Sequence, residues 1–262
     1  MQALRTAATG MSAQQMNVEV ISNNIANMNT IGFKRQRAEF QDLLYQTIER
    51  AGAQSSDQGT VVPTGVQVGG GVKTGSVYRI VSQGAATRTE NPLDIAIQGR
   101  GYLQVLMPSG ETAYTRAGNL SLNDQGQLVT DDGYLIQPAI TVPEDAVDIT
   151  ISKTGQVQIS KADAAVPEIA GQLELASFVN EAGLEAMGDN LFMESGSSGP
   201  AVTGVPGAVG FGQLMQGYTE ASNVDAVSEV TALIVAQRAY EMNSKVITTA
   251  DEMLRAANQV KS

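Results

Sequence analysis

The two ends of this 262-residue chain carry the same apolar repeat, and this feature limits its fold more than any other. Spacings of three, four or seven residues separate the N-terminal set: Leu4, Ala7, Met11, Val18, Ile21, Ile25 and Met28. The C-terminal set is spaced in the same way: Val230, Leu233, Tyr240, Ile247, Ala250, Leu254 and Ala257. A sustained seven-residue repeat keeps one stripe of a helix facing a partner helix. We therefore expect two terminal helices that pair with each other.

The C-terminal repeat predicts a helix too long to bury its own stripe. Ser222-Asn223-Val224-Asp225 supplies capping side chains and an acid for the first turn. No Gly or Pro follows, so the helix spans ~37 residues, or ~55 Å at 1.5 Å per residue. The stripe should first meet the N-terminal helix and then other copies of the chain. We expect a self-assembly interface formed by Leu4, Met11, Val18, Ile21, Ile25, Val230, Leu233, Tyr240, Ile247 and Leu254.

Between the helices the sequence changes from helical spacing to β patterning. Residues 2–28 read as the first helix, and a second amphipathic helical segment is expected over residues 35–48. Residues 51–75 are rich in Gly, which fits either a flexible linker or strands that pair in assembly. Three β-hairpins are predicted at residues 102–115, 120–129 and 149–159. The expected class is α+β.

These patterns divide the chain into three predicted regions. Residues 1–30 and 222–262 form a terminal helical domain, paired as a coiled coil. Residues 31–75 and 200–221 form an extended, β-rich connecting region, whose second part is rich in Gly and Pro. Residues 76–199 form an all-β domain.

Composition excludes several classes of function. The net charge of −11 argues against nucleic-acid binding, because an acidic chain repels phosphate backbones. The absence of Cys and His removes thiolate nucleophiles, imidazole bases and the commonest zinc ligands, and we expect no cofactor. Only 16% of residues are charged, which fits either extensive self-contact or a β surface of Ser, Thr, Gln and Asn. The basic cluster Lys34, Arg35 and Arg37 is interpreted as a solvated turn.

An enzyme function has little support in the sequence. Asp94 and Asp131 are the best candidates for acid–base chemistry, as in a secreted hydrolase of cell-wall glycan. However, Asp131-Asp132-Gly133 is also a common turn sequence. The N-terminus is too polar for a secretory signal, and no run approaches the ~20 apolar residues of a membrane span. We expect no membrane insertion and no cleaved signal peptide.

Four ordered motifs give the chain a family resemblance. Residues 22–35, Ser-Asn-Asn-Ile-Ala-Asn-Met-Asn-Thr-Ile-Gly-Phe-Lys-Arg, resemble the signature of bacterial flagellar rod and hook proteins, the axial proteins. Residues 91–102, 114–130 and 222–254 are similar to three further segments of that family, in the same order. The resemblance implies a family signature at Asn23, Asn24, Asn27, Gly32, Phe33, Asn223, Gln237, Arg238 and Tyr240.

Within this family, residues 41–56 resemble the distal-rod member. The resemblance implies a rod-stiffening segment over about residues 46–66, including Gln46, Thr47, Gln54, Ser55, Ser56 and Val66. It also implies a hollow helical homopolymer that crosses the periplasm, with the terminal helices inside and the β domain outside. Implied partners are proximal rod proteins, the hook protein, periplasmic and outer-membrane ring proteins, and the flagellar export apparatus. A proximal rod or hook subunit and a finite coiled-coil binding module remain alternatives.

Overall fold

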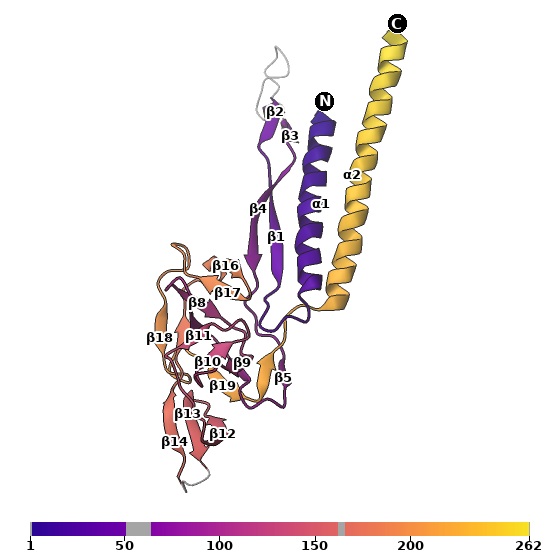
Figure 1. Cartoon of the computed structure of the whole chain (residues 1–262). Coiled ribbons are helices and arrows are strands. Elements are labelled where there is room, and N and C mark those ends of the chain that lie inside the picture. The colour runs from indigo at the N-terminus through magenta and orange to yellow at the C-terminus, as the bar shows by residue number, and fades with distance from the viewer. Residues whose placement is uncertain (1, 51–63, 162–165, 262) are drawn as a thin grey trace. The chain divides into compact units, whose positions relative to one another are not determined.

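The computed structural model describes residues 2–50, 64–161 and 166–261, which form two compact units. The first, here called the helical unit, comprises Met1–Ile25, Gln36–Tyr78 and Asp225–Ser262. The second, the β unit, comprises Ala26–Arg35 and Arg79–Val224. Along the chain, the strands lie between one helix near the N-terminus and one near the C-terminus (Figure 1), which confirms the predicted α+β class.

The described residues of the helical unit form two long helices and four strands. Its helices are α1 (Gln2–Ala26) and α2 (Ala226–Lys261), and its strands are β1 (Gln36–Asp42), β2 (Tyr45–Glu49), β3 (Val66–Gly69) and β4 (Val72–Arg79). Strand β1 pairs with β4, and β2 pairs antiparallel with β3. The Val72 amide donates a hydrogen bond of 3.3 Å to Thr9 Oγ1, so β4 begins against α1 (Figure 1).

The helix predicted over residues 35–48 is wrong, because β1 and β2 occupy this stretch. Phe40, Leu43, Leu44 and Ile48 have helical spacing, but burial in β1 alternates with period two. Ala38 and Phe40 are partly buried while the residues between them are exposed. Pairing with β4, which is remote in sequence, selected the strand over the local helical pattern.

Helix α2 begins at a side-chain cap, as the sequence predicts. Asp225 Oδ1 accepts a hydrogen bond of 2.7 Å from the Ser228 amide, and Ser222 Oγ accepts one of 3.3 Å from the Val224 amide. The bond from Ser228 lowers the pKa of Asp225 below its ordinary value. The helix then runs for 36 residues.

Short strands make up most of the β unit. They are β5 (Ala86–Arg88), β6 (Ile95–Gln98), β7 (Tyr102–Leu106), β8 (Thr112–Thr115), β9 (Leu120–Leu122), β10 (Leu128–Thr130), β11 (Leu135–Gln137), β12 (Ala146–Ile151), β13 (Gln156–Lys161), β14 (Glu168–Gln172), β15 (Leu175–Ser177), β16 (Glu185–Gly188), β17 (Leu191–Met193), β18 (Val202–Gly204), β19 (Gln213–Gln216) and β20 (Tyr218–Glu220), with a 3-10 turn at Glu181–Gly183. The hairpins β7–β8, β9–β10 and β12–β13 confirm the three predicted from sequence.

The largest sheet has nine strands and contributes many residues to the main core of the β unit. Its order is β16-β17-β8-β7-β11-β10-β9, and β15 joins β7 to β18. A three-stranded sheet, β12-β13-β14, and the pairs β6–β19 and β5–β20 complete the unit. Ile95, Ile97, Leu103, Leu128 and Leu175 are fully buried in the core. This rigid β scaffold holds the two segments of chain that lead to the helices.

Candidate functional site

The contact between α1 and α2 is lined by small and polar residues. The buried residues of α1 are Ala7, Ala13, Val20, Ile21 and Asn24, and those of α2 include Glu229, Ala236 and Ala250. Asn243 falls at the same seven-residue spacing, and a Cβ atom on Gly10 would lie 2.9 Å from Asn243 Nδ2. Gly10 therefore packs directly against the Asn243 side chain. The repeat predicted from the sequence is therefore present, but alanines and polar residues carry its buried line in α2.

The larger residues of the predicted interface lie beside this line. Ile21 is buried, whereas Val230 and Tyr240 keep 46% and 42% of their surface exposed. Leu254 is also exposed, and the remaining members are half-buried: Leu4, Met11, Val18, Ile25, Leu233 and Ile247. A single copy thus leaves much of the predicted stripe uncovered.

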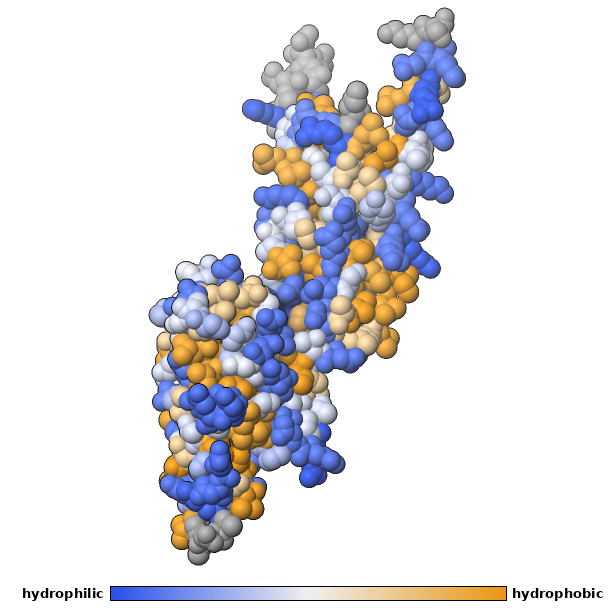
Figure 2. Space-filling model, viewed as in Figure 1, coloured by the Kyte–Doolittle hydropathy of each residue, from blue (hydrophilic) through white to orange (hydrophobic). Residues whose placement is uncertain are grey.

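Helix α2 exposes further apolar side chains. Figure 2 shows hydrophobic surface gathered over the N-terminal half of the helix. The exposed set along the whole helix includes Val227, Ile234, Val235, Met242, Val246 and Met253. A groove of about 340 Å³ opens between the helices and is lined by Gln15, Val18, Glu19, Gln237, Tyr240 and Glu241. Large apolar side chains on an otherwise polar helix are typical of an interaction surface.

Asn24 links three elements of the helical unit. Its Nδ2 donates to the Gln36 carbonyl at 2.8 Å and to Glu229 Oε2 at 3.1 Å. Its Oδ1 accepts a hydrogen bond of 2.8 Å from the Gln36 amide. Asn24 and Glu229 are both buried, while the neighbouring Asn23 is exposed. One signature asparagine therefore joins α1, β1 and α2 through its side chain.

Gly32 shows why the signature needs a glycine after the asparagines. Its φ of 71° lies in the left-handed region. A Cβ atom at this position would lie 2.9 Å from the Ala117 nitrogen and from the carbonyl carbon of Arg116. Its amide donates a hydrogen bond of 2.8 Å to the Glu220 carbonyl. Nearby, Asn27 accepts a hydrogen bond of 3.1 Å from Thr30 Oγ1, and Phe33 is half-buried.

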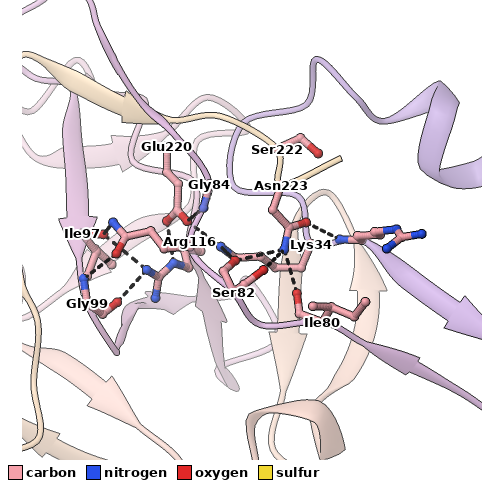
Figure 3. A network of polar contacts seen from close by, with 12 residues as sticks. Lys34, Ile80, Ser82, Gly84, Ile97, Gly99, Arg116, Glu220, Ser222 and Asn223 are labelled. Atoms are coloured by element: carbon pink, nitrogen blue, oxygen red, sulfur yellow. Dashed lines mark hydrogen bonds and ion pairs between the residues drawn. The ribbon is translucent and has the colours of Figure 1, made fainter. Parts of the chain in front are cut away.

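A buried ionic cluster lies in the β unit (Figure 3). Lys34, Arg116 and Glu220 expose 2%, 4% and 1% of their side chains, respectively. Glu220 Oε1 pairs with Lys34 Nζ, and Glu220 Oε2 accepts a hydrogen bond of 2.6 Å from Arg116 Nε. The Lys34 ammonium also donates to the Ser82 carbonyl at 2.9 Å. Burial lowers the pKa of Lys34, while its bond to Glu220 opposes the shift.

The solvated turn predicted for Lys34, Arg35 and Arg37 is therefore wrong at Lys34. A run of three basic residues does not reveal that a carboxylate 186 residues later pairs with one of them. Arg116 and Glu220 are not predicted from the sequence as members of a site. Each is an isolated charge within or directly after a strand pattern, which is the signal that could have identified them.

Asn223, another signature residue, completes this polar cluster. Its Oδ1 accepts a hydrogen bond of 2.6 Å from the Arg35 amide. Its Nδ2 donates to the Ile80 carbonyl at 2.9 Å and to the Ser82 carbonyl at 3.0 Å. The side chain therefore bridges two backbone segments, as a short strand would (Figure 3).

Gln237 and Arg238 are exposed on α2, and Gln237 lines the groove between the helices. In the predicted stiffening segment, Gln46 and Thr47 lie in β2, opposite Val68 and Gln67 of β3. Val66 begins β3 and is exposed. Gln54, Ser55 and Ser56 lie outside the described residues.

The candidate acids do not form a common site. Asp94 is buried and accepts a hydrogen bond of 2.9 Å from Asn91 Nδ2. Asp131 and Asp132 line a cavity of about 350 Å³ whose lining does not include Asp94. The Gly133 amide bonds to the Thr130 carbonyl at 2.9 Å, so these residues form the turn between β10 and β11. The described part of the chain contains no acidic cluster suited to a metal ion, and neither of its helices has an apolar stretch sufficient for a membrane span.

Comparison with known proteins places these features in one family. Residues 4–34 match the model of flagella basal body rod proteins. Residues 96–159 match the flagellar hook protein FlgE/F/G D1 domain, and residues 215–260 match the C-terminal model of flagellar basal body rod FlgEFG proteins.

Three relatives are similar over nearly their whole length, and each is named flagellar basal-body rod protein FlgG. The protein from Caulobacter vibrioides is 71% identical, and the alignment covers all of both chains. The protein from Agrobacterium fabrum is 54% identical over 97% of each chain. The protein from Bacillus subtilis is 40% identical and covers all of this chain and 99% of its own.

Proposed function

Since this chain belongs to the family of flagellar basal-body rod proteins, we propose that it is a structural subunit of the distal rod. It assembles into a hollow helical shaft that transmits torque from the motor to the hook and lets exported subunits pass. The observation that carries this proposal is the uncovered apolar surface of α2, which a single copy leaves in water. Contacts that do not close on themselves convert such a surface into a helical polymer.

In this shaft the terminal helices form the inner layer and the β domain forms the outer shell. The small residues of the α1–α2 contact hold the helices of one copy together. The larger residues beside them, such as Leu233, Tyr240 and Leu254, pack against neighbouring copies. In this division, residues 1–30 and 222–262 are the inner domain, residues 76–199 the outer domain and the remaining residues the connection.

The segment over residues 46–66 braces adjacent subunits and makes the rod stiff. Three observations on its described part support this role: β2 and β3 pair with each other, both are exposed along most of their length, and Tyr45, Ile48 and Val66 present apolar side chains to solvent. Such a hairpin has free apolar surface for a neighbouring subunit.

The protein belongs in the flagellar basal body, as a rod that crosses the periplasm. Its partners are copies of itself, proximal rod proteins, the hook protein, the periplasmic and outer-membrane rings, and the export apparatus that delivers it. We propose that export leaves the N-terminus uncleaved. The intact mass of protein recovered from purified basal bodies tests this, because a cleaved signal would lower that mass.

Electron microscopy of concentrated, purified protein tests the main proposal. Straight tubular polymers are expected, and finite oligomers at every concentration would refute it. Localisation of a tagged copy then distinguishes the distal rod from the proximal rod or the hook, since only a distal-rod subunit lies between the other two.

A further inference from the structure

Two short segments of the β unit connect it along the chain with the terminal helices. The lead-in segment, residues 27–35, follows α1, and the lead-out segment, residues 217–224, precedes α2. The two segments bond to each other directly, since the Gly32 amide donates to the Glu220 carbonyl at 2.8 Å. The lead-in segment also accepts a hydrogen bond of 2.8 Å from the Ile80 amide at the Arg35 carbonyl.

Glu220 ties the lead-out segment to three other parts of the β unit. Its carboxylate accepts from Lys34 of the lead-in segment, from the Gly84 amide at 2.8 Å and from Arg116 after β8. The Arg116 guanidinium continues to the carbonyls of Gly99 at 2.6 Å and Gly101 at 2.9 Å. The lead-in and lead-out segments are therefore both anchored to the loop between β6 and β7 through the buried carboxylate of Glu220 (Figure 3).

This arrangement couples the two segments energetically. Two buried cations share one carboxylate, so withdrawing Glu220 leaves buried charge without its partner, which is strongly unfavourable. Withdrawing Lys34 removes one of the two cations that hold the Glu220 carboxylate in place. Asn223 adds a second link through its side-chain amide. The Oδ1 atom accepts from the Arg35 amide, and the Nδ2 atom donates to the Ile80 carbonyl. Neither the lead-in nor the lead-out segment can leave the β unit without disturbing the other.

We propose that Lys34, Arg116, Glu220 and Asn223 form a clasp that fixes the limits of the independently folded part of this protein. In the unassembled chain the two parts of the β unit, residues 32–35 and 79–223, are ordered whether or not the terminal helices are ordered. All the hydrogen bonds given above for the clasp have both partners within the β unit. The helices can therefore order upon assembly while the ends of the β unit stay in place.

Proteolysis and hydrogen exchange of the dilute full-length monomer test this proposal. Trimming by a broad-specificity protease should stop close to residue 30 at one end and residue 224 at the other. The Ala221 amide donates a hydrogen bond of 2.8 Å to the Ala85 carbonyl. The amides of Gly32, Arg35 and Ala221 should exchange as slowly as those of β7 and β8. Rapid exchange at these three amides, together with cleavage within residues 30–35 or 217–223, would overturn the clasp. This outcome is independent of polymerisation, which is measured at high concentration.

Variants then test the coupling. Asn223→Ala should raise exchange at the Arg35 and Ile80 amides by about tenfold or more, because several hydrogen bonds are lost together. Asn123→Ala is the matched control, since Asn123 also accepts from two backbone amides but lies in the turn between β9 and β10. Lys34→Met should raise exchange at Gly84 and Ala221, which it does not adjoin in sequence. Unchanged exchange at these remote amides in Lys34→Met would refute the coupling, even if Asn223→Ala fails to fold.

Discussion

Asn24 Nδ2 donates a hydrogen bond of 3.1 Å to Glu229 Oε2, joining the last part of the first helix to the first part of the last helix. Both side chains are buried, and the same amide group bonds to both backbone groups of Gln36. A buried polar pair of this kind favours one alignment of two helices over shifted ones, because a shift leaves its groups unpaired.

Asn24→Ala should therefore weaken assembly. The variant loses three hydrogen bonds and leaves the Glu229 carboxylate short of a donor, which costs about 2 kcal/mol or more. The critical concentration for polymerisation, measured by sedimentation, should rise by at least about tenfold. Ser22→Ala is the control, since Ser22 is an exposed polar residue on the same helix. Equal effects of the two substitutions would contradict the role given to Asn24.

The close contact of α1 and α2 predicts a steric effect at Ala236. Ala236→Leu adds a large side chain to a buried position of α2 and should separate the helices, at a cost of about 1–3 kcal/mol. Polymers of this variant should be fewer or absent in electron micrographs. Ala256→Leu makes the same change at an exposed position of α2 and should have a smaller effect on the helix pair. Normal assembly of Ala236→Leu would show that the helices need not approach so closely.

The ionic cluster predicts an order of stabilities among three variants. Glu220→Gln leaves two buried cations without a carboxylate and should cost about 3–5 kcal/mol in the free energy of unfolding. Lys34→Met leaves the pair Arg116–Glu220 intact and should cost less. The double variant should lose less than the sum of the two, because removal of Lys34 relieves the excess positive charge. Urea denaturation of the monomer measures all three, and strictly additive losses would argue against one shared cluster.

The cap of α2 predicts a pH dependence at its N-terminus. The pKa of Asp225 is lowered in the folded state by its bond from Ser228, so the ionised cap stabilises the helix above the ordinary value of 3.8. This stabilisation is lost as the pH falls through the lowered pKa, because the carboxyl then binds a proton. Exchange of the Ser228 amide in the polymer should rise over this acidic range. Asp225→Asn keeps an acceptor without the charge and should lack the step; a step of equal size in both proteins would exclude Asp225 as its cause.

The proposed stiffening segment predicts a mechanical change. Deleting residues 46–66 removes β2 apart from Tyr45 and also the first residue of β3, and so disrupts the exposed apolar hairpin. The deletion polymer should bend, and its persistence length in electron micrographs should fall below that of the wild type. A replacement of the same length by Gly and Ser separates the effect of the side chains from that of chain length. A deletion polymer as straight as the wild type would refute the bracing role.

Local patterns in the sequence are sufficient for the elements whose stability is local. The cap at Asp225, the long helix after it and the three hairpins follow from neighbouring residues, since side-chain caps and turns act over two to four positions. The terminal apolar repeats likewise determine that the chain begins and ends in helices that need partners. The motif at residues 22–35 is enough to indicate the family.

Tertiary structure decided what depends on residues far apart in the chain. Residues 36–49 became strands because β4 and β3 pair with them, although their own spacing fits a helix. Lys34 became buried because Glu220, 186 residues later, supplies the opposite charge. The buried positions of α2 include Ala236 and Ala250, whereas large residues of the repeat such as Tyr240 and Leu254 are exposed. A sequence fixes such features only through the energies of remote contacts, which periodicity and local propensity do not contain.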